Sequence, residues 1–179
     1  MRQLDQQKFC GWCGGMVTYP SKWQSVCSTC GYKQYQNPLP CSSALIICGD
    51  EVLILQRSIE PGKGKFDLPG GFMDMTDKSI EAAAYRELHE ELGIKQRMIT
   101  QVTYFGSGIQ PYEWQGTELL TAPCYFTCHI TTKDRARLVV DPKEGSQVRW
   151  VSRADVPTVD FAFDLDKEML TSYFSNKTP

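Results

Sequence analysis

Short apolar runs separated by turn residues dominate the chain after residue 40. Two of them, at 43–48 and 52–56, are rich in aliphatic residues and flank Gly49-Asp50. This pattern predicts two strands joined by a tight turn. Similar runs predict further strands at 102–105, 124–131 and 148–151.

Helical patterns lie among these strands. One helix is predicted to end at Gly93, with Thr76 or Asp77 as its N-cap, because glycine terminates helices and short polar side chains start them. Asp164 is expected to cap a second helix near the C-terminus. Its apolar face is predicted to contain Leu165, Met169, Leu170 and Tyr173. Short strands mixed with helices predict an α/β fold.

Three carboxylates fall on one face of the first helix. Glu87, Glu90 and Glu91 are spaced at offsets of zero, three and four. Like charges at this spacing repel one another, so we expect a cation among them. Mg²⁺ meets this need because it prefers oxygen ligands. A solvated acidic face is the alternative, but the preceding loop 68–71, Leu-Pro-Gly-Gly, permits close approach and favours a site.

Cysteine spacing predicts a zinc site near the N-terminus. Cys10 and Cys13 form one Cys-x-x-Cys-Gly motif, and Cys27 and Cys30 form a second. Two such motifs indicate a closed tetrahedral Zn²⁺ site with a structural role. A thioredoxin-like redox pair is the alternative, and it leaves the second motif unexplained. The other cysteines lie in strand-like apolar stretches and are expected to be small buried residues: Cys41, Cys48, Cys124 and Cys128.

The chain is therefore expected to contain two domains. Residues 1–40 are expected to form a zinc ribbon and a linker that Pro38 and Pro40 stiffen, and residues 41–179 a second, larger domain. The ribbon has too few apolar residues to fold without metal.

Composition and charge limit the partners. The chain has 179 residues, 41% of them hydrophobic, and a formal net charge of −2. This balance gives no general attraction to nucleic acid or to anionic membranes, so nucleic acid is an unexpected partner. The N-terminal segment, MRQLDQQK, is polar, and the longest apolar run is short. We therefore expect a cytoplasmic protein without a signal peptide or a membrane span.

The segment 86–94, Arg-Glu-Leu-His-Glu-Glu-Leu-Gly-Ile, resembles the REUxEExGU end of the Nudix box, in which U is aliphatic, and Gly71 resembles its start. The family places a glutamate eight positions before Arg86, where this chain has Lys78. Either the loop has gained a residue and Lys78 replaces that glutamate, or Asp77 stands in for it. We favour the first alternative, which leaves the helix register unchanged.

The resemblance implies a fold and a reaction. The fold is the Nudix-type mixed-sheet α/β/α sandwich, here preceded by the ribbon. The reaction is Mg²⁺- or Mn²⁺-dependent cleavage of a nucleoside diphosphate linked to another group, X. Glu87, Glu90 and Glu91 would hold the metal, and Arg86 would orient them. Glu144, in a turn at 141–145, is the candidate for a later general base, although an exposed turn carboxylate is an equal alternative.

The order of ribbon, linker and box is similar to a branch that contains NADH and FAD pyrophosphatases. The NADH enzymes carry a Ser-Gln-Pro-Trp-Pro-Phe-Pro-type segment that 108–114 does not reproduce, and Pro111 is similar to a proline of ADP-ribose hydrolases. ADP-ribose, FAD and NADH are therefore all candidate substrates. Lys63 and Lys65 are expected near the phosphates. Candidate substrate-binding residues are Arg57 for phosphate and Phe72, Tyr112 and Trp114 for ring stacking.

A second hypothesis treats the protein as a nucleotide sensor, or as a zinc ribbon that binds nucleic acid or a partner protein. The ribbon has few basic residues, namely Lys8, Lys22 and Lys33, which counts against binding driven by phosphates. The three glutamates favour catalysis. The resemblance also implies that a homodimer can form.

Overall fold

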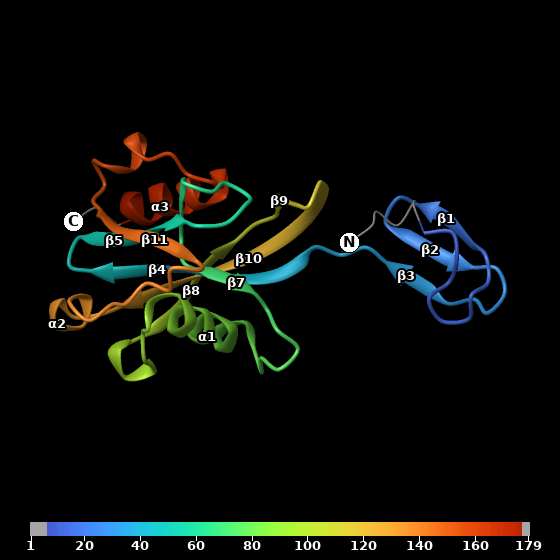
Figure 1. Ribbon diagram of the computed structural model, residues 1–179, viewed down its shortest axis with the longest axis horizontal. Helices are drawn as coiled ribbons and strands as arrows, with labels where there is room; N and C mark the ends of the chain where they lie inside the picture. The colour runs from blue at the N-terminus through green and yellow to red at the C-terminus, as the bar shows by residue number, and fades with distance from the viewer. Residues whose placement is uncertain (1–6, 177–179) are drawn as a thin grey trace.

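The computed structural model describes residues 7–176. Most of the polar N-terminal segment, residues 1–6, and the last three residues, 177–179, lie outside this range. The described chain forms a small three-stranded sheet followed by an eight-stranded mixed sheet with helices on both faces (Figure 1). In the described range no helix is long and apolar enough to cross a membrane.

The large sheet has the strand order β11-β5-β4-β10-β8. Its central pair, β4 and β10, is parallel, and the other pairs are antiparallel. Short strands β6, β7 and β9 extend β5, β4 and β10. The bounds are β4 Leu39–Cys48, β5 Glu51–Arg57, β6 Phe66–Asp67, β7 Gly70–Phe72, β8 Val102–Ser107, β9 Gln110–Trp114, β10 Thr117–His129 and β11 Gly145–Val151.

The structure confirms the predicted mixed-sheet α/β fold and contains a strand at each of the five predicted places. β10 is much longer at its N-terminal end than the predicted 124–131 and stops at His129. β4 begins at Leu39, within the segment assigned to the linker. The division into two domains at residue 40 stays a prediction.

Helix α1 (Ile80–Leu92) begins at a different cap from the one expected. The Ser79 hydroxyl accepts a hydrogen bond from the Ala82 N–H at 3.2 Å, so the expectation of Thr76 or Asp77 as N-cap was wrong. Asp77 instead faces Arg86, at 3.0 Å between carboxylate and guanidinium. Gly93 ends the helix in the left-handed conformation, as predicted, with φ of 64°.

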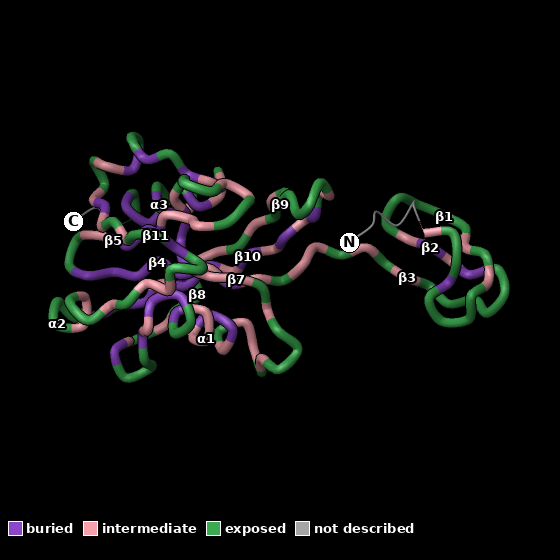
Figure 2. The backbone as a smooth tube through the Cα atoms, in the orientation of Figure 1, coloured by how far each residue is buried: buried purple, intermediate pink, exposed green. Residues whose placement is uncertain are grey.

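Alternating side chains of the central strands build two cores, one on each face of the sheet. Ala44 and Ile46 of β4 pack toward α1, whereas Leu45 and Ile47 pack toward α3 (Asp164–Asn176). Figure 2 shows this buried centre. A strand covered on both faces is apolar throughout, which explains why the run was visible in the sequence. On α3, Leu170 and Tyr173 are buried, and Leu165 and Met169 pack beside them.

Of the four cysteines outside the ribbon, Cys48 and Cys128 are buried, as expected. Cys41 and Cys124 are only partly buried. A short helix, α2 (Thr132–Arg135), and two 3-10 turns, Gln96–Met98 and Val156–Thr158, connect the larger elements.

The small sheet contains β1 (Val17–Ser21), β2 (Gln24–Cys27) and β3 (Lys33–Tyr35), and it positions the two cysteine motifs. The four sulfur atoms lie within 4.8 Å of one another. Two sulfur–sulfur distances, 3.9 Å for Cys10–Cys30 and 3.5 Å for Cys13–Cys27, are close to the edge of about 3.8 Å of a tetrahedron with Zn–S bonds of about 2.3 Å. The cluster therefore has the size and ligands of a structural zinc site.

Backbone N–H groups stabilise thiolate at this cluster. The N–H groups of Cys30 and Thr29 donate to the Cys27 sulfur, each at 3.4 Å, and they lower the pKa of Cys27 to about 6. Trp12 and Gly15 donate in the same way to the sulfurs of Cys10 and Cys13. The Cys27 thiolate held ready in this way favours metal binding at neutral pH. At Cys13 the Gly15 N–H lowers the pKa, but hydrogen bonds with the Cys30 and Cys27 sulfurs outweigh it and raise that pKa to about 12.

We predict that the purified protein holds one zinc ion per chain and that Cys27→Ser reduces this content several-fold, because a thiolate ligand is lost. Elemental analysis measures the ratio, and limited proteolysis reports unfolding of residues 9–33. Cys124→Ser is the matched control and should keep its zinc. Equal zinc content in both variants would contradict the assignment.

Candidate active site

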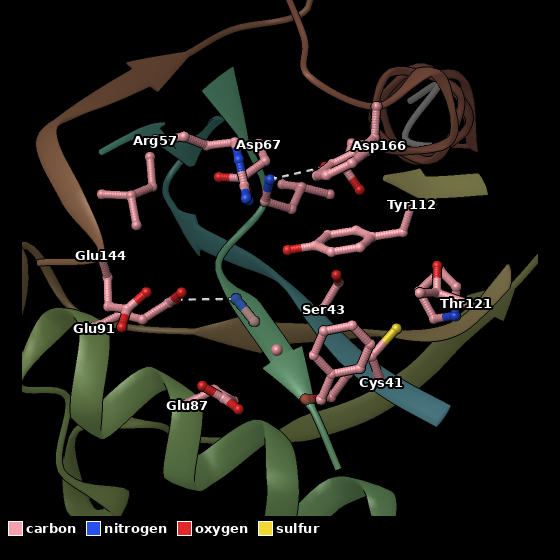
Figure 3. A pocket seen from close by; sticks show the side chains of 18 of the residues that line it. Cys41, Ser43, Arg57, Asp67, Glu87, Glu91, Tyr112, Thr121, Glu144 and Asp166 are labelled. Atoms are coloured by element: carbon pink, nitrogen blue, oxygen red, sulfur yellow. Dashed lines mark hydrogen bonds and ion pairs between the residues drawn. The ribbon is translucent and has the colours of Figure 1, made fainter. Parts of the chain in front are cut away.

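A pocket of about 280 Å³ opens beside β7, between α1 and the start of α3 (Figure 3). It is strongly acidic, since five carboxylates line it and Arg57 is the one basic side chain among its described lining residues. The carboxylates come from four regions of the chain, namely β6, helix α1, the loop before β11 and helix α3: Asp67, Glu87, Glu91, Glu144 and Asp166. Such a concentration of like charge needs a cation or bound protons.

The three predicted metal ligands are not equivalent. Glu87 and Glu91 line the pocket, whereas Glu90 lies outside the lining and is largely exposed. The carboxylate of Glu90 pairs with Arg86 at 2.9 Å. The helical spacing therefore brings the glutamates to one side of α1, but two of the three face the pocket.

Glu91 is the most deeply buried of these glutamates, with 7% of its surface exposed. Its carboxylate accepts a hydrogen bond from the Gly70 N–H at 3.0 Å. Burial raises the pKa of Glu91 well above its ordinary value, and the charges of Asp67, Glu87 and Glu144 add to this effect. Burial also raises the pKa of Glu87. A bound cation would reverse both shifts by stabilising the charged forms.

Arg86 holds four groups together. It donates to Asp77 at 3.2 and 3.0 Å, to Glu87 at 2.8 Å and to the Phe72 carbonyl at 2.9 Å, besides its bond to Glu90. The bonds to Asp77 are the main cause that raises the pKa of Arg86. Asp77 therefore supports this arginine, which is the alternative that we did not favour. The preference for Lys78 at this position was wrong, because the turn before Ser79 brings the Asp77 carboxylate to the guanidinium of Arg86.

Gly71 leaves room for Glu87. A Cβ atom at this position would lie 2.5 Å from a carboxylate oxygen of Glu87. Gly70 has φ of 150°, and a Cβ atom there would lie 2.1 Å from the Ser42 carbonyl oxygen. Both positions need glycine because a neighbour lies very close: the Glu87 carboxylate at Gly71, and the backbone of strand β4 at Gly70.

Arg57 lines the pocket but is already paired. Its guanidinium forms an ion pair with Asp67, donates to the Pro61 carbonyl at 2.6 Å and lies 5.1 Å from the ring of Phe163. Burial raises the pKa of Asp67 to about 6 despite this arginine. Glu144 also lines the pocket, where Figure 3 places it beside Glu91.

Aromatic rings form the wall opposite the glutamates. Tyr112 packs edge-on against Phe72 and stacks on Phe163, with ring centroids 5.4 and 5.9 Å apart. Trp114, at the exposed end of β9, lies outside the pocket lining. Lys63 and Lys65, in the loop between β5 and β6, lie outside it as well. Lys65 pairs with Asp160 at 3.4 Å. The structure thus places two of the three predicted aromatic residues, Phe72 and Tyr112, in the pocket.

Sequence reasoning missed Asp67, Phe163 and Asp166. Asp166 is buried on α3, where it accepts hydrogen bonds from the Tyr125 hydroxyl at 2.7 Å and the Leu68 N–H at 3.1 Å. Burial raises its pKa to about 7. An aspartate at the polar start of a helix looks like an ordinary first-turn residue, so no local signal marked it.

The donor set fits a hard divalent cation. Glu87 and Glu91 supply carboxylate oxygens on one side of the pocket, and Glu144 lies close enough to Glu91 to raise its pKa. Magnesium is usually bound by a few carboxylates together with water and phosphate oxygens. The pocket also offers a ring-lined wall, so it suits a metal-bound nucleotide.

Comparison with known proteins agrees with this geometry. A family model described as NUDIX domain matches residues 39–173. The "NAD-capped RNA hydrolase NudC" of Citrobacter koseri is 32% identical over 152 residues, which cover 84% of this chain and 53% of the relative. The protein of the same name from Escherichia coli O1:K1 / APEC gives the same identity and coverage. The chain spans about half the length of these curated relatives.

Solved structures show the same fold. A NUDIX hydrolase from Nitrosomonas europaea superposes with a TM-score of 0.68 at 24% identity, covering 96% of this chain and 92% of the other. The NUDIX domain of Shewanella oneidensis NrtR, crystallised with ADP ribose, gives a TM-score of 0.65 at 21% identity and covers 80% and 91%. At these identities the likeness concerns the fold.

We predict that Gly71→Ala leaves the protein folded but lowers its affinity for Mn²⁺ about tenfold or more, because the new methyl group displaces the Glu87 carboxylate. Electron paramagnetic resonance of free Mn²⁺ measures this affinity. Gly11→Ala is the control, since a Cβ atom there meets no atom within 4 Å. Equal affinity in the two variants would contradict a role for Glu87 as a ligand.

We also predict a pH dependence of stability from Asp166. Its pKa is about 7 in the folded protein and near 4 in the unfolded chain, so between these values the folded state binds the extra proton. The stability that this group contributes is present below about pH 4 and is lost as the pH rises through 7. When the pH rises from 5 to 8, the free energy of unfolding should therefore fall in wild type by on the order of 2 kcal/mol more than in Asp166→Asn.

Urea unfolding of the metal-free pocket, followed by circular dichroism at both pH values, measures this difference. Asp164→Asn, on the exposed side of the same helix, is the control and should keep the wild-type pH dependence. If the free energy of unfolding changed equally with pH in wild type and in Asp166→Asn, the prediction would be refuted.

Proposed function

The chain belongs to the Nudix family, and from this membership we propose that it is a divalent-metal-dependent pyrophosphohydrolase. The reaction adds water across the P–O–P bridge of a nucleoside diphosphate linked to X. One phosphorus gains the water oxygen, the bridge bond breaks, and a nucleoside monophosphate and X-phosphate leave. The observation that carries the proposal is the buried Glu91 carboxylate, which shares a pocket with four other carboxylates and needs a cation.

A Mg²⁺ or Mn²⁺ ion bound at this site would neutralise the pyrophosphate and lower the pKa of bound water. Glu87 and Glu91 are the ligands that already face the pocket, and Glu90 is the third candidate. Arg86 keeps Glu87 and Glu90 in place through two hydrogen bonds on one guanidinium nitrogen. The chain itself thus supplies negative charge for the metal and fixes the orientation of that charge.

Glu144 is the candidate general base. It lines the pocket from a loop that is fixed to β5, since its carbonyl accepts the Ser58 N–H at 3.0 Å. A carboxylate on an element separate from α1 can approach the attacking water from another side than the metal ligands. Arg57 would contact a phosphate oxygen from the opposite wall, while Asp67 holds its guanidinium in place.

The substrate class that we propose is a dinucleotide of the NAD type, with FAD and ADP-ribose as further candidates. Phe72, Tyr112 and Phe163 offer ring faces for an adenine or nicotinamide ring. The names of the curated relatives, NAD-capped RNA hydrolases, support the NAD type and make RNA a partner to consider. Against this class stands the segment 108–114, which differs from the motif of NADH pyrophosphatases.

We predict Mg²⁺-dependent turnover of at least one of NADH, FAD and ADP-ribose to a nucleoside monophosphate. Replacement of Glu87, Glu90 or Glu91 by glutamine should reduce this turnover on the order of 100-fold, because each change removes a charged oxygen ligand. Chromatographic separation of the products measures the rate and identifies the bond that is cleaved.

Glu168→Gln, an exposed residue of α3, is the control for the charge change and should retain wild-type turnover. Full activity in the Glu87 and Glu91 variants would refute the assigned roles. Nucleotide binding without turnover in wild type would instead support the alternative of a nucleotide sensor.

A further inference from the structure

The ribbon exposes an unusual number of aromatic rings. Trp12 is 81% exposed, between two cysteines of the cluster, and it stacks on Tyr32 with ring centroids 6.2 Å apart and planes at 19°. Further exposed rings lie around the small sheet: Phe9, Trp23 and Tyr35. Figure 2 shows how much of this part of the molecule is exposed. Large flat apolar side chains in water are unfavourable unless a partner covers them.

Charge restricts what this partner is. Residues 7–40 contain no aspartate or glutamate, and their charged side chains are Lys8, Lys22 and Lys33. The Lys22 ammonium lies 4.6 Å above the ring of Trp23. An anion with flat rings would match such a surface, as single-stranded nucleic acid does. With zinc bound, four thiolates and the ion add about two negative charges. Attraction to phosphates is therefore weak, and stacking must supply most of the affinity.

A continuous hairpin connects this surface to the pocket. Tyr112 of β9, which lines the pocket, pairs with Leu119 of β10. Leu119 and Leu120 in turn line a small crevice with Trp23 of the ribbon. In Figure 1 the hairpin of β9 and β10 extends from the large sheet toward the ribbon. A chain that leaves the pocket along this hairpin would reach the exposed rings.

We propose that the ribbon binds the single-stranded RNA of a substrate whose 5′-terminal dinucleotide occupies the pocket. Successive bases would stack on the exposed rings, above all on the free face of Trp12. This inference rests on the proposed pyrophosphohydrolase activity and deepens it. It also revises the expectation that nucleic acid is an unexpected partner, because that expectation counted lysines and did not consider rings.

The test compares two substrates with one set of variants of the full chain. NADH probes the pocket alone, and a ten-nucleotide single-stranded RNA that carries a 5′ NAD cap probes the pocket and the ribbon together. Trp12→Ala and Trp12→Ala/Tyr32→Ala should lower kcat/KM for the capped RNA about fivefold or more while leaving NADH turnover unchanged. Tyr104→Ala, an exposed ring of β8, is the matched control and should change neither substrate. Zinc content and melting temperature confirm that each variant is folded.

Direct binding gives a second readout. Fluorescence anisotropy with an uncapped, fluorescein-labelled RNA should show about fivefold or more weaker binding by Trp12→Ala. Three lysines give a slope of log K against log salt no steeper than about −2 for a single strand. A much steeper slope would overturn the proposal, because phosphate contacts elsewhere would then dominate.

The outcomes separate this inference from the proposed function. Equal cleavage of capped RNA by wild type and by Trp12→Ala would overturn the role of the ribbon while leaving the hydrolase intact. If wild type does not cleave NADH, FAD or ADP-ribose, the proposed function fails. The anisotropy comparison of wild type with Trp12→Ala then still decides whether the ribbon binds single-stranded RNA. A change in molecular mass in solution on Trp12→Ala, without a change in RNA binding, would identify the surface as a contact between copies and also overturn the proposal.

Discussion

Carboxylates from opposite helical layers hold the loop on which the pocket is built. Asp166 of α3 accepts the Leu68 N–H, and Glu91 of α1 accepts the Gly70 N–H, so the segment that runs from Leu68 into β7 is fixed from both sides. Gly70 also packs directly against the backbone of β4, so this segment lies close to the sheet. Everything that the pocket does depends on this constraint, since the same loop carries Gly71 past Glu87 and leads to the carbonyl that Arg86 contacts.

The same arrangement creates an electrostatic problem. Buried carboxylates at Asp67, Glu91 and Asp166 all have raised pKa values, and burial is the largest cause in each case. Hydrogen bonding separates two roles within this acidic cluster, a structural role and a cation-binding role. Asp166 accepts two hydrogen bonds from its neighbours and holds structure, whereas Glu91 accepts one and keeps oxygen lone pairs for a cation. Burial without full pairing distinguishes a binding carboxylate from a structural one.

Whether a contact of the site could be predicted from the sequence depended on how far apart its residues lie along the chain. Glu87, Glu90 and Glu91 could be placed on one face of α1 because helical spacing is a local property. The contact between Leu68 and Asp166 joins residues 98 positions apart, and no local pattern reports it. Asp77 shows an intermediate case: the sequence offered two partners for Arg86, and only the path of the turn before Ser79 decided between them. The long N-terminal half of β10 was missed because its residues are mixed polar and apolar.

Charge is distributed unevenly between the small sheet and the large sheet. Acidic groups converge on the pocket, whereas residues 7–40 carry lysines and no carboxylate. In the proposed reaction, the acidic pocket would repel a polyphosphate substrate without a metal, so a bound metal and not the general field would have to draw the reacting phosphates in. The ribbon offers no strong field either, but it offers rings. Recognition of a long substrate would therefore be divided, with metal coordination at the bond that breaks and stacking beyond it. In this proposal the division would allow a small dinucleotide and an extended strand to share one catalytic centre, because the extra contacts would lie where a dinucleotide does not reach.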